Sequence, residues 1–213
     1  MIEQLKLGFK MMRYTFGIKM CVIIGAIFLV LGLAMECLPP GMSMGGGAFV
    51  MVCGMWPAQL IYSLAVSNMV KTSKYAKAME TSVPTSVCFV PFVLCYIVII
   101  LFKLPRLSGA TEEMLGCMSA ELIVCACIAA GLMVFCGIAF KLFTLSVIIV
   151  FVLCCSSGIL LDVFSVSMPF GMAVIIGFAI LVAGALLQYV LSCLLYKIPL
   201  AKGAQLRGLQ KYM

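Results

Sequence analysis

The chain has 213 residues, of which 65% are hydrophobic and only 10% are charged. Soluble globular chains are roughly half apolar and about one quarter charged, so this composition indicates an integral membrane protein and leaves no polar stretch long enough for a separate soluble domain. The net charge of +7 does not indicate nucleic-acid binding, because nearly all basic residues flank apolar segments. The chain has no histidine, which excludes histidine-based catalysis and histidine metal sites.

The first eighteen residues carry an amphipathic pattern. Apolar side chains at positions 2, 5, 9, 12 and 16 recur at steps of three and four, which places them on one face of a helix. Lys6, Lys10 and Arg13 lie largely off that face. A basic amphipathic helix of this kind lies in the membrane interface with its apolar face toward lipid. We therefore predict an interfacial helix over residues 1–18; a plain cytoplasmic extension is the alternative.

Six apolar segments follow, and each has about the 20 residues that are needed to cross the hydrocarbon core. Proline and glycine residues over positions 39–47 separate the first segment from the second. Trp56-Pro57 lies inside the second segment and predicts a bend, because proline lacks a backbone donor. The expected fold is all-α, with six transmembrane helices and a basic tail. The predicted spans cover residues 19–35, 48–67, 83–102, 114–140, 142–161 and 170–196, and the tail covers residues 197–213.

The distribution of basic residues predicts the orientation. If the N-terminus is inside, twelve of the fourteen lysines and arginines lie on the inner side and only Lys103 and Arg106 lie in outer loops. Cytoplasmic loops of membrane proteins carry an excess of lysine and arginine. We therefore expect a multi-pass protein of the plasma membrane with both termini in the cytoplasm.

Residues 71–80 form the largest polar connection on the predicted inner side. Their sequence, KTSKYAKAME, is rich in good helix formers. Ser82-Val83-Pro84 follows and suits the end of one helix before a new span begins. A short cytoplasmic helix between two spans can bind a soluble partner. The same basic residues also satisfy the positive-inside pattern without any partner, so both interpretations remain open from the residues alone.

The whole pattern resembles the membrane subunit of an ABC-2-type ABC transporter. The resemblance is carried by the interfacial helix over residues 1–16, by six spans with both ends inside, and by the segment from Tyr62 through Pro84. It implies that residues 71–80 form a cytoplasmic coupling helix. One departure is the short connection over residues 162–169, where many members of the family carry re-entrant helices; residues 158–170 would at most form a reduced version.

The resemblance also implies that ATP and magnesium are bound by separate ATPase chains, so this chain would bind no cofactor and would not itself be an enzyme. The sequence agrees, because it contains no GxxxxGK[ST] phosphate loop. The implied partners are the ATPase subunits and a second permease chain, identical or not, within the lipid bilayer. The residues expected to couple this chain to the ATPase are Lys71, Lys74, Tyr75, Lys77, Met79 and Glu80.

Glu121 is the acidic residue that lies well inside an apolar segment. Carboxylates within a membrane are costly and are candidates for substrate or proton contact; partial hydration near the outer surface is the alternative. Gln59 and Gln188 are expected to join helices through hydrogen bonds. Most of the twelve cysteines lie in apolar segments without a C-x-x-C pair, so we interpret them as small buried hydrophobes.

Two functional hypotheses follow from these residues. The first is a permease subunit of an ATP-driven transporter that exports an amphipathic substrate such as a peptide, lipid or drug. The second is an ion-coupled carrier that uses Glu121, or a non-transporting immunity or scaffold protein. An intramembrane enzyme is disfavoured, because the sequence has no H-E-x-x-H or G-x-S-x-G motif and no paired aspartates.

Overall fold

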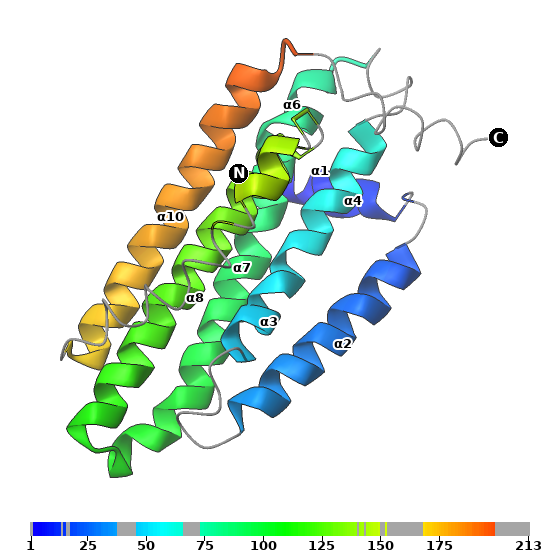
Figure 1. The fold of residues 1–213 in the computed structure, drawn as a ribbon. Coiled ribbons are helices and arrows are strands. Elements are labelled where there is room, and N and C mark those ends of the chain that lie inside the picture. The colour runs from blue at the N-terminus through cyan, green and yellow to red at the C-terminus, as the bar shows by residue number, and fades with distance from the viewer. Residues whose placement is uncertain are drawn as a thin grey trace.

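The computed structural model describes residues 2–13, 15, 18–37, 46–65, 73–139, 141–142, 144–149, 152 and 168–198. The described residues are helical or lie in short connections, and they contain no strand. The long helices run side by side as a bundle (Figure 1). The elements in chain order are α1 (Ile2–Met12), α2 (Ile18–Glu36), α3 (Gly46–Val52), η1 (Cys53–Met55), α4 (Trp56–Ala65), α6 (Ala76–Glu80), α7 (Ser82–Lys103), η2 (Leu104–Gly109), α8 (Glu112–Ile138) and α10 (Phe170–Leu195).

Five helical segments of the described chain are long and apolar enough to cross a membrane. This finding supports a multi-pass membrane protein, because helices satisfy all of their backbone hydrogen bonds internally and can therefore lie in hydrocarbon. The five segments are Ile18–Glu36, Gly46–Ala65, Ala76–Gly109, Glu112–Ile138 and Phe170–Leu195.

Five of the six predicted spans overlap these segments. The other predicted span, residues 142–161, lies mostly outside the described residues, although residues 144–149 are helical. Three further predicted parts lie outside the described residues: residues 71–72 of the coupling helix, most of the connection over 158–170, and residues 199–213 of the tail. The sixth span and the orientation of the termini therefore remain predictions.

The second membrane segment changes its helix type where the sequence predicts a bend. A short 3-10 helix, η1, separates α3 from α4 immediately before Trp56-Pro57. Proline lacks a backbone N–H and is tolerated in the first turn of a helix, which explains why α4 begins here. Gly54 in η1 lies directly against the ring of Phe92 on α7: a Cβ at this position would lie 2.6 Å from Phe92 Cδ1. The change of helix type thus coincides with close packing of the backbone on α7.

The main core lies where α3, α4, α7, α8 and α10 meet. Its largest buried side chains include Phe92, Tyr96, Leu122 and Met133. The closest packing joins α8 to α10, and Gly184 makes it possible, because a Cβ there would lie 2.7 Å from that of Ala130. Small residues permit close approach of helices in membranes, so the glycines of α10 determine how tightly this helix joins the bundle.

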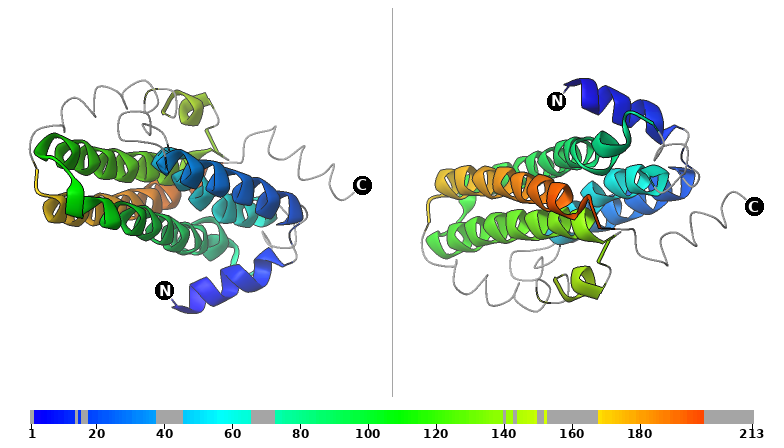
Figure 2. Two further views of the ribbon diagram at one scale, coloured as in Figure 1. Left: turned by 90° about the horizontal axis from the view of Figure 1, so that it is seen from below. Right: turned by 90° about the horizontal axis from the view of Figure 1, so that it is seen from above.

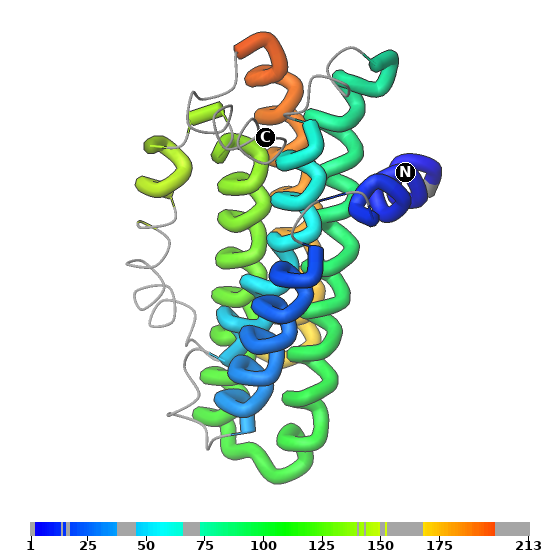
Figure 3. The backbone as a smooth tube through the Cα atoms, turned by 90° about the vertical axis from the view of Figure 1, so that its right-hand side faces the viewer, coloured from blue at the N-terminus to red at the C-terminus, as the bar shows by residue number. Residues whose placement is uncertain are grey.

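Helix α1 runs across the bundle on one side of it (Figures 2 and 3). It packs on α4 and α7, where Gly8 lies against Val83 and Val87. The predicted apolar face is divided between two environments: Leu5 and Met12 pack against the protein, whereas Phe9 is 46% exposed. This difference arises because α1 crosses α7, which covers only part of the apolar face. The sequence pattern alone does not distinguish a surface that faces protein from one that faces lipid.

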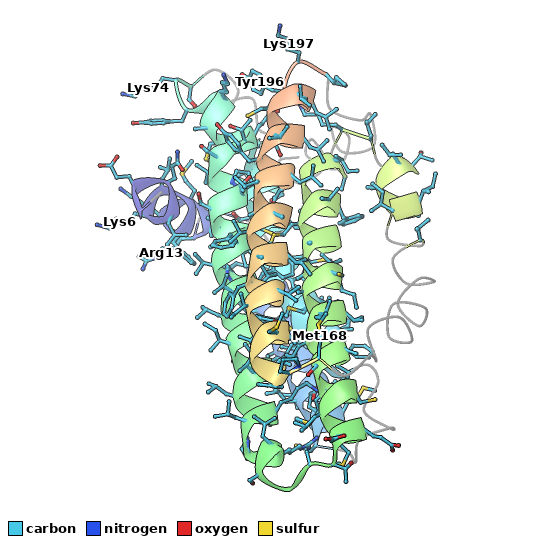
Figure 4. The ribbon with its side chains drawn as sticks, turned by 90° about the vertical axis from the view of Figure 1, so that its left-hand side faces the viewer. Lys6, Arg13, Lys74, Met168, Tyr196 and Lys197 are labelled. Carbon is cyan, nitrogen blue, oxygen red and sulfur yellow. The ribbon has the colours of Figure 1, made fainter. Side chains whose placement is uncertain are left out.

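Four described lysines gather at one end of the bundle: Lys74, Lys77, Lys141 and Lys197. We call this the basic end; it contains α6 and the carboxyl ends of α4, α8 and α10 (Figures 1 and 4). Helix α1, which carries Lys6 and Arg13, lies further along the bundle (Figure 4), and Lys103 and Arg106 lie at the opposite end. Which end faces the cytoplasm remains a prediction from the positive-inside pattern.

Candidate functional site

In the described part of the predicted coupling helix over residues 71–80, only residues 76–80 form a helix, α6, directly before α7, and residues 73–75 form a turn that precedes it. Lys74, Tyr75 and Lys77 are exposed, and Lys74 Nζ lies 5.2 Å from the centre of the Tyr75 ring. Lys71 lies outside the described residues. One side of this segment is therefore a solvent-facing surface that carries two positive charges and an aromatic ring.

Met79 is on the other side of α6 and faces the protein. Its side chain is 1% exposed and belongs to a buried cluster with Leu60, Ile61 and Val83. Complete burial of a methionine side chain contributes about 1.5–3 kcal/mol. Met79 therefore anchors α6 on α4 and α7, and the surface that α6 presents outward consists of the neighbouring exposed residues.

Glu80 ends α6 and forms an ion pair with Lys141, which follows α8. Lys141 Nζ lies 2.7 Å from Glu80 Oε2 and also donates to the carbonyl oxygens of Tyr196, at 3.3 Å, and Ile198, at 2.8 Å. An ammonium has three N–H donors, and here three acceptors satisfy them. We call these four residues the Lys141 cluster. It connects α6, the end of α8 and the end of α10 through one side chain.

A second ion cluster lies at the opposite end and includes Glu121. Lys103, the last residue of α7, pairs with Glu121 on α8 and lies 3.2 Å from Oε2 of Glu36, the last residue of α2. Arg106 on η2 donates to the backbone carbonyl of Glu36. We call these four residues the Lys103 cluster. The side chains of Glu36 and Lys103 are each 3% exposed, and that of Glu121 is 15% exposed.

Three glycines allow Glu36 to reach this position. A Cβ at Gly46 would lie 2.7 Å from the carbonyl oxygen of Gly32 and 2.9 Å from Glu36 Cγ. A Cβ at Gly47 would lie 3.3 Å from Glu36 Oε1. Helices α2 and α3 therefore meet backbone to backbone, and Glu36 is held between them and Lys103.

The Lys103 cluster balances two carboxylates with two cations. Lys103 lies between two carboxylates, and the guanidinium of Arg106 adds a second positive charge at the carboxyl end of α2, where cations are favourable. Removing ions from water costs several kcal/mol each, and only good pairing offsets this cost. The cluster therefore holds the ends of α2, α7 and α8 together as a unit that depends on all of its charges.

The sequence singled out Glu121 but not its partners. The predicted spans end at residues 35 and 102, so they leave Glu36 and Lys103 just outside, whereas the structure has them as the last residues of α2 and α7. No spacing relates the three residues, since they belong to three different helices. The available signal was their common depth: each lies near the predicted outer end of its span, where a buried carboxylate needs a cation.

Comparison with protein-family models, with curated proteins and with solved structures finds no match for this chain. Within the described residues, no group of three or more histidine, cysteine, aspartate or glutamate side chains is arranged to hold a metal ion. The chemistry of the described bundle is that of its charged and polar side chains, which gather mainly at its two ends.

Proposed function

We propose that this chain is the membrane subunit of an ATP-driven transporter, with the layout of an ABC-2-type permease, and that it exports an amphipathic substrate. One observation carries this proposal: residues 73–80, which comprise a turn and α6, have an exposed basic side and a buried side that is attached to the bundle. Lys74, Tyr75 and Lys77 are exposed, while Met79 and Glu80 join α6 to the membrane helices. A helix that transmits motion from a soluble partner needs both of these surfaces.

The attachment of α6 supplies a route for motion into the bundle. Only Thr81 separates α6 from α7, and the Thr81 hydroxyl donates to the carbonyl oxygen of Lys77 at 2.7 Å. The Lys141 cluster adds the ends of α8 and α10. When two ATPase chains close on ATP, a displacement of α6 would tilt these helices as rigid bodies, which is a common way to alternate access.

The other partners of the transporter are two ATPase chains, a second permease chain and the lipid bilayer. ATP and magnesium bind to the ATPase chains, and acidic groups on those chains meet Lys74 and Lys77. A second permease chain completes the transporter. Helix α1 lies in the cytoplasmic interface of the plasma membrane, where exposed Lys6, Lys10 and Arg13 meet lipid headgroups.

Recovery of partners from native membranes tests the proposal. The tagged chain is isolated in mild detergent and the retained proteins are identified by mass spectrometry. We expect an ATPase with a phosphate-binding loop, and we expect Lys74→Glu with Lys77→Glu to reduce its recovery at least tenfold. The matched control is Lys6→Glu with Lys10→Glu, which changes the same charge on α1. Undiminished recovery with the α6 variant, or no ATPase with the unaltered chain, would contradict the proposal.

The Lys103 cluster favours a second candidate, an ion-coupled carrier. Ionisable residues within membrane segments often mark ion pathways, and Glu121 pairs with Lys103 at the end of α7. A carrier would transport substrate in vesicles that contain an ion gradient and no ATP. Loss of that activity in Glu121→Gln, together with the absence of an ATPase partner, would favour the carrier over the transporter subunit.

A further inference from the structure

Gln188 on α10 is a buried amide without a hydrogen-bond partner. Its side chain is fully buried, and neither its oxygen nor its nitrogen makes a hydrogen bond within the described structure. The amide lies beside Tyr62 on α4 and Cys88 on α7, so the prediction that Gln188 joins helices stays a prediction, with no hydrogen bond of good geometry formed in this conformation.

The surroundings of Gln188 combine polar and apolar groups from four helices. Tyr62 on α4 and Ser192 on α10 share a hydrogen bond of 3.3 Å between their hydroxyl oxygens. Gly137 on α8 lies alongside: a Cβ there would be 3.2 Å from Gln188 Cγ and 3.3 Å from Ser192 Oγ. The thiol of Cys88 on α7 and the hydroxyl of Tyr62 lie within reach of the amide as hydrogen-bonding neighbours, although neither meets it with the geometry of a full hydrogen bond.

An unpaired amide at this depth is unfavourable. A buried donor or acceptor without a partner costs about 1–3 kcal/mol, and the cost rises in apolar surroundings. An apolar side chain of the same length, such as methionine, would avoid it. In this conformation Gln188 therefore contributes no hydrogen bond of good geometry, and a ligand that replaced its neighbours could satisfy both its donor and its acceptor.

The charges along the bundle limit the kind of ligand. Charged side chains are absent from residues 56–65, 82–102, 122–138 and 170–195, the helical stretches that surround Gln188 between the two ion clusters. A charged group at this depth would find no counter-ion in these helices. An amide carries both a donor and an acceptor, so its best neutral complement is another amide.

We propose that Gln188, with Tyr62 and Ser192, binds a neutral amide group of the transported substrate, such as the backbone of an apolar peptide. The inference rests on the proposed transport function and names its substrate class. Since Gln188 is closed off in this conformation, the substrate reaches it when α10 separates from α4, which breaks the Tyr62–Ser192 hydrogen bond. Substrate amide groups then satisfy Gln188, and the bundle releases them as it closes again.

Photolabelling of the purified full chain in lipid nanodiscs, without any ATPase, tests the inference. The probe is an acetylated and amidated leucine tripeptide that carries a diazirine, and labelled residues are located by mass spectrometry. The competitors are the same tripeptide without the diazirine and its ester analogue, which lacks the backbone N–H groups. Gln188→Met and Gln188→Leu are compared with Gln59→Met, which removes a partly exposed amide on α4. The thermal unfolding temperature is measured for each variant.

We expect saturable labelling near residues 62, 188 and 192, competed at least tenfold better by the amide than by the ester. In Gln188→Met the labelling should fall at least tenfold while the unfolding temperature stays equal or rises, and Gln59→Met should label normally. If wild type shows no saturable labelling, or if the Gln188 variants label normally or unfold at a lower temperature, the inference is overturned and Gln188 is a structural residue. Because no ATPase is present, this result is independent of whether α6 binds one.

Discussion

The two ends of the bundle each hold a lysine that joins three segments, but the two lysines meet different partners. Lys141 pairs with one carboxylate and two backbone carbonyls, and the side chains of Lys141 and Glu80 keep 10% and 12% of their exposure. Lys103 lies between two carboxylates, and the side chains of Lys103 and Glu36 keep only 3% each. The two clusters therefore differ in the acceptors that surround the lysine and in the access of water to it.

This difference predicts different roles for the two ends. When the Lys141 cluster opens, its carbonyls and carboxylate can turn toward water, so the energy lost is small. When the Lys103 cluster opens, Glu36, whose side chain is 3% exposed, remains buried without its cation, which is costly, whereas Glu121 at 15% is about as accessible as Glu80. The basic end is therefore suited to motion during a transport cycle, whereas the opposite end keeps α2, α7 and α8 together. Each of the following experiments weakens one side of this comparison.

Loss of the Lys103 ammonium should have the largest effect. Lys103→Met leaves Glu36 and Glu121 without the ammonium between them, and we expect the free energy of unfolding in detergent to fall by about 3–5 kcal/mol. Lys74→Met, an exposed lysine at the other end, is the control and should change it by less than about 0.5 kcal/mol. Adding Glu36→Gln and Glu121→Gln to Lys103→Met should restore most of the stability. A triple variant less stable than Lys103→Met would contradict the charge argument.

A methyl group added where α2 meets α3 should have the next largest effect on the free energy of unfolding. Gly46→Ala places a methyl group 2.7 Å from the carbonyl oxygen of Gly32 and 2.8 Å from the amide nitrogen of Glu36. Backbone atoms cannot move aside easily, so we expect a loss of about 1–3 kcal/mol in denaturant titrations. Gly171→Ala is the matched control, because a Cβ there meets nothing within 4 Å. Equal stability of the two variants would show that α2 is not held at this point.

Removal of the Lys141 ammonium should lower the free energy of unfolding less than the two preceding changes, but it should strongly reduce transport. Lys141→Met is expected to lower the free energy of unfolding by about 1 kcal/mol, since Glu80 retains access to water. ATPase co-purification should persist, while ATP-driven transport in reconstituted vesicles should fall at least tenfold. Lys197→Met removes an exposed lysine nearby and should leave both unchanged. Transport at the level of the control would remove the Lys141 cluster from the coupling route.

Charge reversal on the exposed side of α6 should have the smallest effect on stability. Lys74 and Lys77 make no ion pair among the described residues, so Lys74→Glu with Lys77→Glu should change the free energy of unfolding by less than about 0.5 kcal/mol. Thermal unfolding of the purified chain measures this directly. A loss above 2 kcal/mol would mean that these lysines support the fold, and their loss could not then be interpreted as loss of a partner surface.

Local properties of the chain were sufficient to predict much of the fold. The length and apolarity of a segment decide whether it can cross a membrane, and five predicted spans overlap the apolar helices of the structure. Trp56-Pro57 predicted a bend, and the helix type changes immediately before it, because the missing amide of proline acts within one turn. The amphipathic pattern of residues 1–18 predicted a helix, although the crossing with α7 divides its apolar face between protein and surroundings.

Contacts between helices required the tertiary structure. Glu121 was identified as a candidate from its depth, but its pairing with Lys103, and the position of Glu36 beside them, depend on the rotation and height of three separate helices. The burial of Met79, the pairing of Glu80 and the isolation of Gln188 have the same origin. Hydropathy and spacing act along one segment, whereas charge pairing and hydrogen bonding between spans depend on distances that only the packed bundle determines.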